Sequence, residues 1–199
     1  QSMFAHVPGL EVIMPSTPHD IIETYRYARK HHKGPVVSLE HRLMYDIDFE
    51  HDAENSVSST NPFGSKIVLP GTDVTIVATS IMVLEAKRAA KFLEAEGISV
   101  EIIDLVSPSN PDIELIINSL RKTNRLIVAD TSWLQYGVAA EICRLVLQQD
   151  IGLLKVPAEC LGMANAPCPT AKSLEDIYYP TIKDIRNATY KVLNRKVPE

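Results

Sequence analysis

The sequence predicts an α/β fold with a mostly parallel sheet, helices on both faces and one antiparallel edge strand. Short apolar runs alternate with helical patterns from residue 74 onward, which is the order typical of a parallel sheet. A central apolar run ends on Asp130 and leads through a turn with Gly137 into a helical pattern. Ligands and partners of open α/β sheets sit at the carboxyl ends of the strands, so residues 130–137 are the first place to look for function.

A βαβ unit is predicted at the start of the chain. Its strands are expected at residues 10–14 and 35–39, and its helix at residues 18–30. Thr17 suits the N-cap and Pro18 suits the first helical position. The segment before the first strand contains no complete element, and the second strand is expected to continue past its apolar run.

The chain is predicted to have three parts. Residues 1–45 are too few to form a domain, and we interpret them as the end of a second, larger α/β domain. Residues 46–65 are acidic and polar without apolar periodicity, which is typical of an interdomain linker. Residues 66–199 carry the alternating pattern and are expected to form one domain.

The larger domain is expected to open with a hairpin, because the turn at residues 70–73 separates two apolar runs. Its strands are expected at residues 66–69, 74–78, 99–105, 125–129 and 154–159. Its helices are expected at residues 82–95, 111–122, 138–148 and 182–193, the first of them ended by Gly97.

Composition excludes several classes of function. A net charge of -5 argues against a nucleic-acid surface. Cys143, Cys160 and Cys168 have no Cys-x-x-Cys spacing and no histidine pair beside them, which predicts reduced structural thiols rather than zinc. No stretch approaches the ~20 apolar residues of a membrane span, and no signal-peptide pattern is present. We therefore expect a protein of the cytoplasm, or of an organelle matrix after import.

Few residues suggest a catalytic site. The chain contains neither of the two glycine-rich phosphate-loop motifs. His31 and His32 are interpreted as a solvated basic helix end. The triplet Glu40-His41-Arg42 follows a predicted strand, where a structural ion pair or a domain-interface contact is favoured over catalysis.

Trp133 and Tyr136 flank the turn after the central strand, and two interpretations remain open. Large aromatic side chains are mostly buried, which favours packing against the next domain or the following helix. Aromatic residues are also enriched at interfaces, which favours a partner surface. Neither interpretation makes these residues catalytic.

Motifs in five parts of the chain belong together. They are Phe4-Ala-His-Val-Pro-Gly-Leu10, Val12-Ile-Met-Pro15, Pro35-Val-Val-Ser-Leu-Glu40 with Leu43-Met-Tyr45, Gly137-Val-Ala-Ala-Glu-Ile-Cys143 and Leu174-Glu-Asp176. Together they resemble the beta subunit of the decarboxylating first component of 2-oxoacid dehydrogenase complexes, pyruvate dehydrogenase above all, within the transketolase superfamily. The resemblance implies that residues 1–45 end the pyrimidine-binding domain and that residues 66–199 form a transketolase C-terminal domain.

The chain also departs from the pattern of these relatives. Val106 stands where many relatives have Arg, and Thr170 stands where they commonly have Tyr. In relatives the turn after the central strand often begins with Glu or Gly and contains a second Gly, whereas here it is Thr131-Ser132-Trp133. These changes leave the substrate and the partner contacts open.

The resemblance implies thiamine diphosphate with magnesium as cofactor, bound between the pyrimidine-binding domain and a diphosphate-binding domain of an alpha subunit. The family's activating glutamate and active-site histidine would lie upstream of Gln1. No catalytic, cofactor-binding or metal-binding residue is therefore assigned in this chain. We expect that an upstream portion was removed and that this fragment is inactive alone.

The implied activity is oxidative decarboxylation of pyruvate or a related 2-oxoacid, with acyl transfer to a lipoyl domain. The implied partners are the alpha subunit and a second beta subunit of a heterotetramer, and the acyltransferase core of the complex. The C-terminal domain would serve subunit assembly, and the candidate partner interface consists of Trp133, Tyr136, Glu175 and Asp176. In a eukaryote the compartment would be the mitochondrial matrix. The alternatives are a transketolase-like or acetoin-cleaving subunit, and a non-catalytic assembly module, since the chain lacks every cofactor motif.

Overall fold

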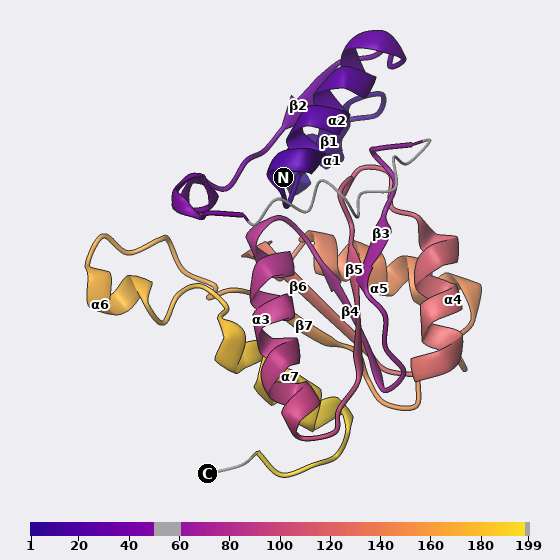
Figure 1. The fold of residues 1–199 in the computed structure, drawn as a ribbon, viewed down its shortest axis with the longest axis vertical. Coiled ribbons are helices and arrows are strands. Elements are labelled where there is room, and N and C mark those ends of the chain that lie inside the picture. The colour runs from indigo at the N-terminus through magenta and orange to yellow at the C-terminus, as the bar shows by residue number, and fades with distance from the viewer. Residues whose placement is uncertain (50–60, 198–199) are drawn as a thin grey trace.

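The computed structural model describes residues 1–49 and 61–197, and these residues form two sheets (Figure 1). A two-stranded sheet belongs to the N-terminal unit, and a five-stranded sheet forms the centre of the larger domain. The N-terminal unit lies against one end of the larger domain. Residues 50–60 of the predicted linker lie outside the described residues, and the domain boundaries stay a prediction.

The N-terminal unit is the predicted βαβ arrangement. Its elements are α1 (Ser2–Ala5), β1 (Glu11–Ile13), α2 (Pro18–Lys30), β2 (Val36–Ser38) and the 3-10 helix η1 (Arg42–Asp46). β1 and β2 pair in parallel, and the Thr17 hydroxyl accepts a hydrogen bond from the Asp20 backbone N–H, which confirms the N-cap. Two expectations were wrong: α1 forms where no element was expected, and η1 replaces the continuation of the second strand.

The larger domain confirms the predicted α/β class. Its strands are β3 (Lys66–Leu69), β4 (Val74–Ala78), β5 (Val100–Asp104), β6 (Leu126–Trp133) and β7 (Glu159–Met163). They lie in the order β3-β5-β4-β6-β7, with β3 antiparallel to β5 and the other pairs parallel. The helices are α3 (Ile81–Ala95), α4 (Ile113–Thr123), α5 (Val138–Gln149), the short α6 (Lys172–Glu175), which the sequence did not predict, and α7 (Ile182–Val192).

The predicted hairpin is wrong, because β5 lies between β3 and β4. The backbone N–H groups of Thr72 and Asp73 donate to the Ser99 carbonyl at 3.2 and 2.8 Å, so the turn crosses the start of β5. A Cβ on Gly71 would lie 2.2 Å from the Val100 carbonyl carbon, and glycine permits this close crossing. The antiparallel edge strand is therefore present, but it pairs with a different neighbour.

The strand predicted at residues 154–159 is also displaced along the chain, since β7 begins only at Glu159. The Lys155 backbone N–H donates to the Asn124 carbonyl at 3.0 Å, which directs this apolar run to the end of α4. Pro157 has no N–H to contribute to a strand ladder. Pairing with β6 starts where Glu159 lies opposite Ile127.

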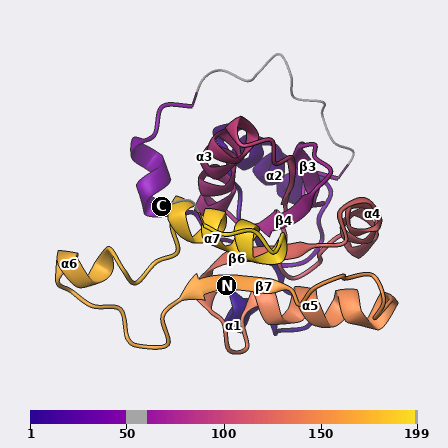
Figure 2. The same ribbon diagram turned by 90° about the horizontal axis from the view of Figure 1, so that it is seen from below.

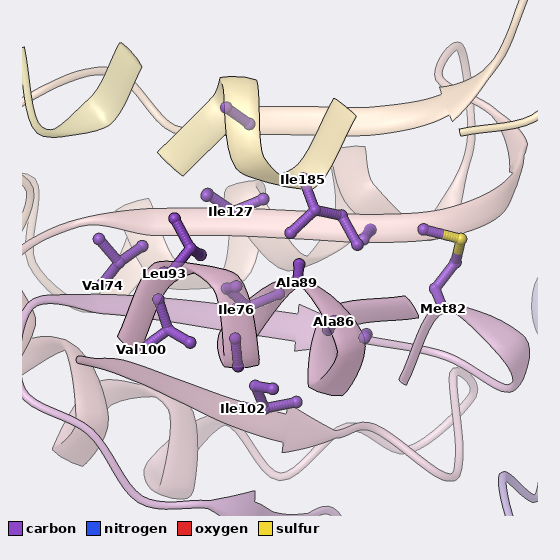
Figure 3. Packing of buried hydrophobic residues seen from close by; sticks show 14 of the residues in the cluster. Val74, Ile76, Met82, Ala86, Ala89, Leu93, Val100, Ile102, Ile127 and Ile185 are labelled. Carbon is purple, nitrogen blue, oxygen red and sulfur yellow. The ribbon is translucent and has the colours of Figure 1, made fainter. Parts of the chain in front are cut away.

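Two apolar clusters cover the two faces of the larger sheet. The cluster in Figure 3 joins α3 and α7 to the strands through side chains that include Met82, Ala86, Leu93 and Ile185. The other cluster joins α4 and α5 to the opposite face through side chains that include Ile116, Leu120, Ile142 and Val146. Figure 2 shows α7 and α5 on opposite sides of the sheet, as predicted.

Backbone hydrogen bonds attach the N-terminal unit to the segment after β5. The Met14 N–H donates to the Val106 carbonyl at 2.7 Å, and the Val12 N–H donates to the Ser109 hydroxyl at 2.8 Å. Val106 has a positive φ of 53°, which is uncommon for a β-branched residue. Val106, the residue with the left-handed conformation, is therefore also the residue whose carbonyl accepts the hydrogen bond from Met14 of the N-terminal unit.

Phe63 provides a further attachment, from the end of the predicted linker. Its side chain is buried, and its ring lies 5.0 Å from Tyr27 and 5.5 Å from His32, both in edge-to-face geometry. The interpretation of His32 as a solvated residue is therefore wrong, because its ring packs against Phe63. Residues 61–65 belong to the packed structure.

Candidate functional site

Asp130 lies in β6, three residues before the end of that strand and beside the end of β4, the central strand of the sheet. It begins the segment 130–137, where the sequence predicted function. Its carboxylate is buried and accepts hydrogen bonds from the Thr79 hydroxyl at 2.5 Å, from the Gln1 side-chain amide at 2.7 Å and from the Ser132 hydroxyl. These donors satisfy a buried charge. Asp130 therefore joins the start of the chain to the ends of β4 and β6, and exposed residues follow it.

Trp133 and Tyr136 are exposed. β6 extends past the predicted end to Trp133, which pairs with Met163 of β7 and is 48% exposed. Tyr136 is 96% exposed and has a positive φ of 57°. Within the described residues, Tyr136 therefore does not pack against the following helix, which contradicts that interpretation for this residue. Its participation in a partner interface stays a prediction.

Two glycines allow the segments around Trp133 to approach closely. A Cβ on Gly137 would lie 2.2 Å from the Trp133 carbonyl oxygen, and a Cβ on Gly162 would lie 2.5 Å from the Ser132 carbonyl oxygen. Leu134 also lies against Gly162, with a side-chain carbon 2.9 Å from that Cβ position. Glycine at these positions permits the exposed turn to pack directly on the start of α5 and on β7.

Glu175 and Asp176 lie at the end of α6, on a segment that extends away from the sheet in Figure 1. Lys172 pairs with both carboxylates, at 3.3 and 2.8 Å, and all three side chains are solvent-exposed. Hydrogen bonds to Asp176 and Glu175 raise the pKa of Lys172. Exposed ion pairs of this kind add little stability.

The Ala166 carbonyl joins these two parts of the predicted interface. It accepts hydrogen bonds from the Trp133 indole N–H at 3.2 Å and from the Tyr178 hydroxyl at 2.8 Å, two residues beyond Asp176. Exposed apolar side chains occur on both sides of this carbonyl. We define the carboxyl-end surface as Trp133, Leu134, Tyr136, Leu174, Glu175, Asp176 and Ile177.

A polar cluster of three buried residues and one partly exposed lysine lies at the junction between the N-terminal unit and the larger domain. The Ser16 hydroxyl donates to Asp104 at 2.5 Å, and Lys66 contacts Asp20 directly and lies 4.0 Å from Asp104. Burial raises the pKa of Asp104 to about 6, and the Asp20 charge adds to this effect, while Lys66 and Ser16 oppose it. We define the junction cluster as these four residues.

A cavity of about 230 Å³ lies at the carboxyl end of β2. Glu40 lines it and accepts hydrogen bonds from the hydroxyls of Tyr25 at 2.8 Å and Tyr45 at 3.0 Å. Within residues 1–49 and 61–197, Glu40 has these hydroxyl partners and no salt bridge, so the described residues do not contain the predicted ion pair. Burial lowers the pKa of the neighbouring His41, whose Nδ1 is buried.

The described residues do not fit a diphosphate cofactor and its magnesium ion. Within the two described segments, no group of three or more His, Cys, Asp or Glu side chains is placed to hold a metal ion. The chain also has no glycine-rich phosphate loop. We therefore derive no catalytic step from these residues. Each helix in the described part of the chain is too short or too polar to cross a membrane.

The five-stranded sheet, its antiparallel edge and its covering helices define a domain of the transketolase C-terminal class. The description "Transketolase, C-terminal domain" matches residues 64–185, and the chain belongs to that family. This finding confirms the predicted superfamily. The match begins two residues before the predicted start of the larger domain.

The relatives extend the similarity to the N-terminal unit. The chain is 40% identical over 199 residues to "Pyruvate dehydrogenase E1 component subunit beta, mitochondrial" of Pisum sativum, which covers 99% of this chain and 55% of the relative. It is 36% identical over 196 residues to "Acetoin:2,6-dichlorophenolindophenol oxidoreductase subunit beta" of Cupriavidus necator, which covers 96% of this chain and 56% of the relative. The chain spans about half the length of the curated relatives it matches.

A solved structure has the same arrangement. It is called "Split gene transketolase, inactive beta4 tetramer" and superposes with a TM-score of 0.75 at 26% identity, covering 98% of this chain and 61% of that chain. The high coverage includes the N-terminal unit. The predicted resemblance to pyruvate dehydrogenase beta subunits and to transketolases is thus confirmed.

Sequence reasoning identified only part of the carboxyl-end surface. It missed Leu134, Leu174 and Ile177, which are 42%, 53% and 78% exposed. Leu174 and Ile177 are three positions apart beside two acids, and this spacing was the available signal of a short helical turn. Nothing in the sequence indicated that the Ala166 carbonyl joins this turn to Trp133.

Proposed function

We propose that this chain is part of the beta subunit of a thiamine diphosphate-dependent 2-oxoacid dehydrogenase. The observation that carries the proposal is 40% identity to a pyruvate dehydrogenase E1 beta subunit across 99% of the chain. The similarity includes both the N-terminal unit and the larger domain, in a fold with a TM-score of 0.75 to a transketolase chain. In the proposed reaction a 2-oxoacid loses carbon dioxide and its acyl group passes to a lipoyl domain.

The role that we propose for this chain is assembly. Tyr136 is almost fully exposed in a left-handed conformation, although large aromatic side chains are usually buried in folded domains. Aromatic residues surrounded by polar ones are typical of the centre of a protein interface. Trp133, Tyr136, Glu175 and Asp176 would accordingly contact another subunit or the acyltransferase core.

The cofactor in this proposal is thiamine diphosphate with magnesium, held by the complete heteromer rather than by this chain alone. The partners are an alpha subunit, a second beta subunit and the acyltransferase core. The compartment would be the cytoplasm, or the mitochondrial matrix in a eukaryote. The proposal of a mitochondrial compartment is supported by the name of the Pisum sativum relative, which is a mitochondrial protein.

The test is coexpression of the native-length protein with its candidate alpha subunit, followed by decarboxylation assays with a panel of 2-oxoacids. We expect activity that requires both chains and added thiamine diphosphate. A complex that assembles and binds no thiamine diphosphate by calorimetry would overturn the dehydrogenase proposal. It would favour the non-catalytic assembly module, an alternative supported by the "inactive beta4 tetramer" name of the similar structure.

The assembly role is tested separately with a matched pair of variants. We expect Tyr136→Ala to weaken binding of the acyltransferase core or of a subunit at least ~10-fold, because exposed aromatic anchors concentrate binding energy. Ile151→Ala removes another exposed apolar side chain, 83% exposed, beyond the opposite end of α5. It should leave binding unchanged. Equal effects of the two variants would contradict a specific role for Tyr136.

An acetoin-cleaving enzyme is the second candidate, because an acetoin oxidoreductase beta subunit shares 36% identity over 96% of the chain. The same coexpressed protein should then cleave acetoin with an artificial electron acceptor and leave 2-oxoacids unchanged. A transketolase-like subunit would instead transfer carbon fragments between sugar phosphates. The substrate profile therefore separates the three enzymes.

A further inference from the structure

Two cysteines that are 17 positions apart in the sequence lie in contact in the fold. Cys143 is on α5 and Cys160 is on β7, and their Sγ atoms are 3.6 Å apart. Both are free thiols and both are half-buried. The sequence showed no Cys-x-x-Cys spacing and gave no sign of this pair, because a helix and a strand bring the two residues together.

The surroundings give the two sulfur atoms different roles. Both side chains pack against the apolar cluster between α4, α5 and the sheet. A hydrogen bond from the Cys143 thiol lowers the pKa of Cys160, while burial and Glu159 oppose this effect. The same hydrogen bond raises the pKa of Cys143, as does burial. Cys160 is therefore the better nucleophile, since the thiolate is the reactive form.

We propose that Cys143 and Cys160 form a reversible redox-modification site that reacts with low-molecular-weight disulfides such as oxidised glutathione. The Cys160 thiolate attacks one sulfur of the small disulfide, forms a mixed disulfide and releases one thiolate. Cys143 then loses its proton to solvent and attacks the Cys160 sulfur, releasing the second thiolate. Two protein thiols are oxidised to one disulfide, and one small disulfide is reduced to two thiols.

The geometry favours the second step. The sulfur atoms must approach from 3.6 Å to the ~2.05 Å of a disulfide bond, a movement of less than 2 Å. An intramolecular attack from contact distance has a large advantage over attack by a second small thiol. Cys168 has a different environment, because it is exposed and its Sγ lies 3.4 Å from the Tyr179 hydroxyl. It can form mixed disulfides of its own and is therefore replaced by serine in the experiment below.

A disulfide here would join the two elements that support the carboxyl-end surface. α5 begins directly after Gly137, and β7 ends at Met163, opposite Trp133. The new bond would close a loop of about 17 residues, which restricts the unfolded chain. The oxidised protein should accordingly have a thermal midpoint roughly 5 to 10 °C above that of the reduced protein.

The experiment uses the full chain carrying Cys168→Ser, so that only the pair can react. The protein is equilibrated with glutathione buffers of increasing oxidised fraction, quenched with N-ethylmaleimide and measured by intact mass and peptide mapping. We expect two maleimide adducts in reducing buffer, none in oxidising buffer, and a crosslinked peptide containing both cysteines. Two adducts at every buffer ratio, or glutathione adducts without the crosslink, would overturn the proposal.

Single substitutions separate the two roles. Adding Cys143→Ser should leave a stable glutathione adduct on Cys160, because no neighbouring thiol can displace it. Adding Cys160→Ser should slow modification of the remaining thiol by about 10-fold, because Cys143 is the weaker nucleophile. Equal rates for the two variants would contradict this assignment. The crosslink in the Cys168→Ser protein decides the proposal even if either added substitution impairs folding.

Discussion

Two groups of residues lie near the carboxyl ends of parallel strands of the same sheet, and they differ in their exposure to solvent. The junction cluster gathers around the end of β5, where Asp104 is fully buried. The carboxyl-end surface follows β6, where Tyr136 is 96% exposed. The N-terminal unit covers Asp104 and contributes Ser16 and Asp20 to the first group, whereas nothing in the described part of the chain covers Tyr136. One end of one sheet thus contains both an internal contact and a surface available to a partner.

The difference determines how charges act in the two places. At the junction, Lys66 faces two carboxylates that are largely removed from water, where electrostatic interactions are strong. On the carboxyl-end surface, Lys172 also faces two carboxylates, but all of them are solvent-exposed. Solvent screening weakens that pairing. The two lysines therefore form a matched pair for testing the comparison.

The largest effect is expected for Lys66→Met. The substitution keeps an unbranched apolar chain but leaves Asp20 and Asp104 without their cation, which should lower the free energy of unfolding by roughly 3 to 4 kcal/mol at pH 8. Lys172→Met should change it by less than about 0.5 kcal/mol. Urea denaturation of both variants measures this difference. Similar losses for the two variants would show that charge pairing in the junction cluster stabilises the fold no more than exposed charge pairing does.

The next largest effect is expected in the pH dependence of stability, because of Asp104. Its pKa is raised from 3.8 to about 6, so between these values the folded state holds more protons than the unfolded state. Asp104 therefore makes its full contribution to the free energy of unfolding below pH 3.8. This contribution is lost as the pH rises through 6, and it amounts to about 2 to 3 kcal/mol in total. Glu101 and Glu141 have lowered pKa values and act in the opposite direction in acid.

Asp104→Asn isolates this contribution. We expect the stability difference between wild type and variant to change steadily between pH 4 and 7, because only wild type loses the favourable proton. Glu114→Gln, on the exposed start of α4, should leave the wild-type slope intact. Parallel stability curves for wild type and Asp104→Asn would mean that this carboxyl titrates at an ordinary pH. Chemical denaturation at fixed ionic strength provides the measurement.

The sequence predicted what local chemistry determines. Thr17 and Pro18 define the start of α2, and Gly97 has the positive φ that ends α3. The errors concern contacts between distant segments. The residue pattern of β3 and β4 suits a hairpin equally well. Only the strand pairing in the fold, with Gly71 passing close to Val100, shows that β5 lies between them. The strand predicted at residues 154–159 was likewise placed by local pattern, and the contact of Lys155 with Asn124 that displaces it is not visible in the sequence.

The candidate site divides in the same way. Trp133 and Tyr136 were found because aromatic residues beside a glycine turn are visible in the sequence. The junction cluster was not found, since its residues come from three separate segments, which contain Ser16 with Asp20, Lys66, and Asp104. Long-range proximity of polar side chains leaves no periodic signal in a single sequence.

Gly162→Ala tests how the carboxyl-end surface is held. A Cβ there would lie 2.5 Å from the Ser132 carbonyl oxygen, so β7 and the exposed turn must separate. We expect a loss of roughly 1 to 2 kcal/mol in unfolding free energy and a changed tryptophan fluorescence spectrum, because Trp133 pairs with β7. In Gly152→Ala, a Cβ meets only an Asp150 carboxylate oxygen at 3.3 Å. That control should keep the spectrum, and an unchanged spectrum in both would contradict the close approach.

Substitution of Tyr136 is expected to have the smallest effect on the free energy of unfolding, in contrast to substitutions in the junction cluster. Its side chain is almost fully exposed and its φ of 57° is unfavourable for a residue with a Cβ. Tyr136→Gly should therefore raise the free energy of unfolding by about 0.5 to 1 kcal/mol, whereas Tyr136→Ala keeps the strain and should leave it unchanged. A loss above about 1 kcal/mol in both variants would mean that Tyr136 packs within the chain. A gain for glycine alone would mean that folding does not require this tyrosine, which is the result that the proposed partner contact predicts.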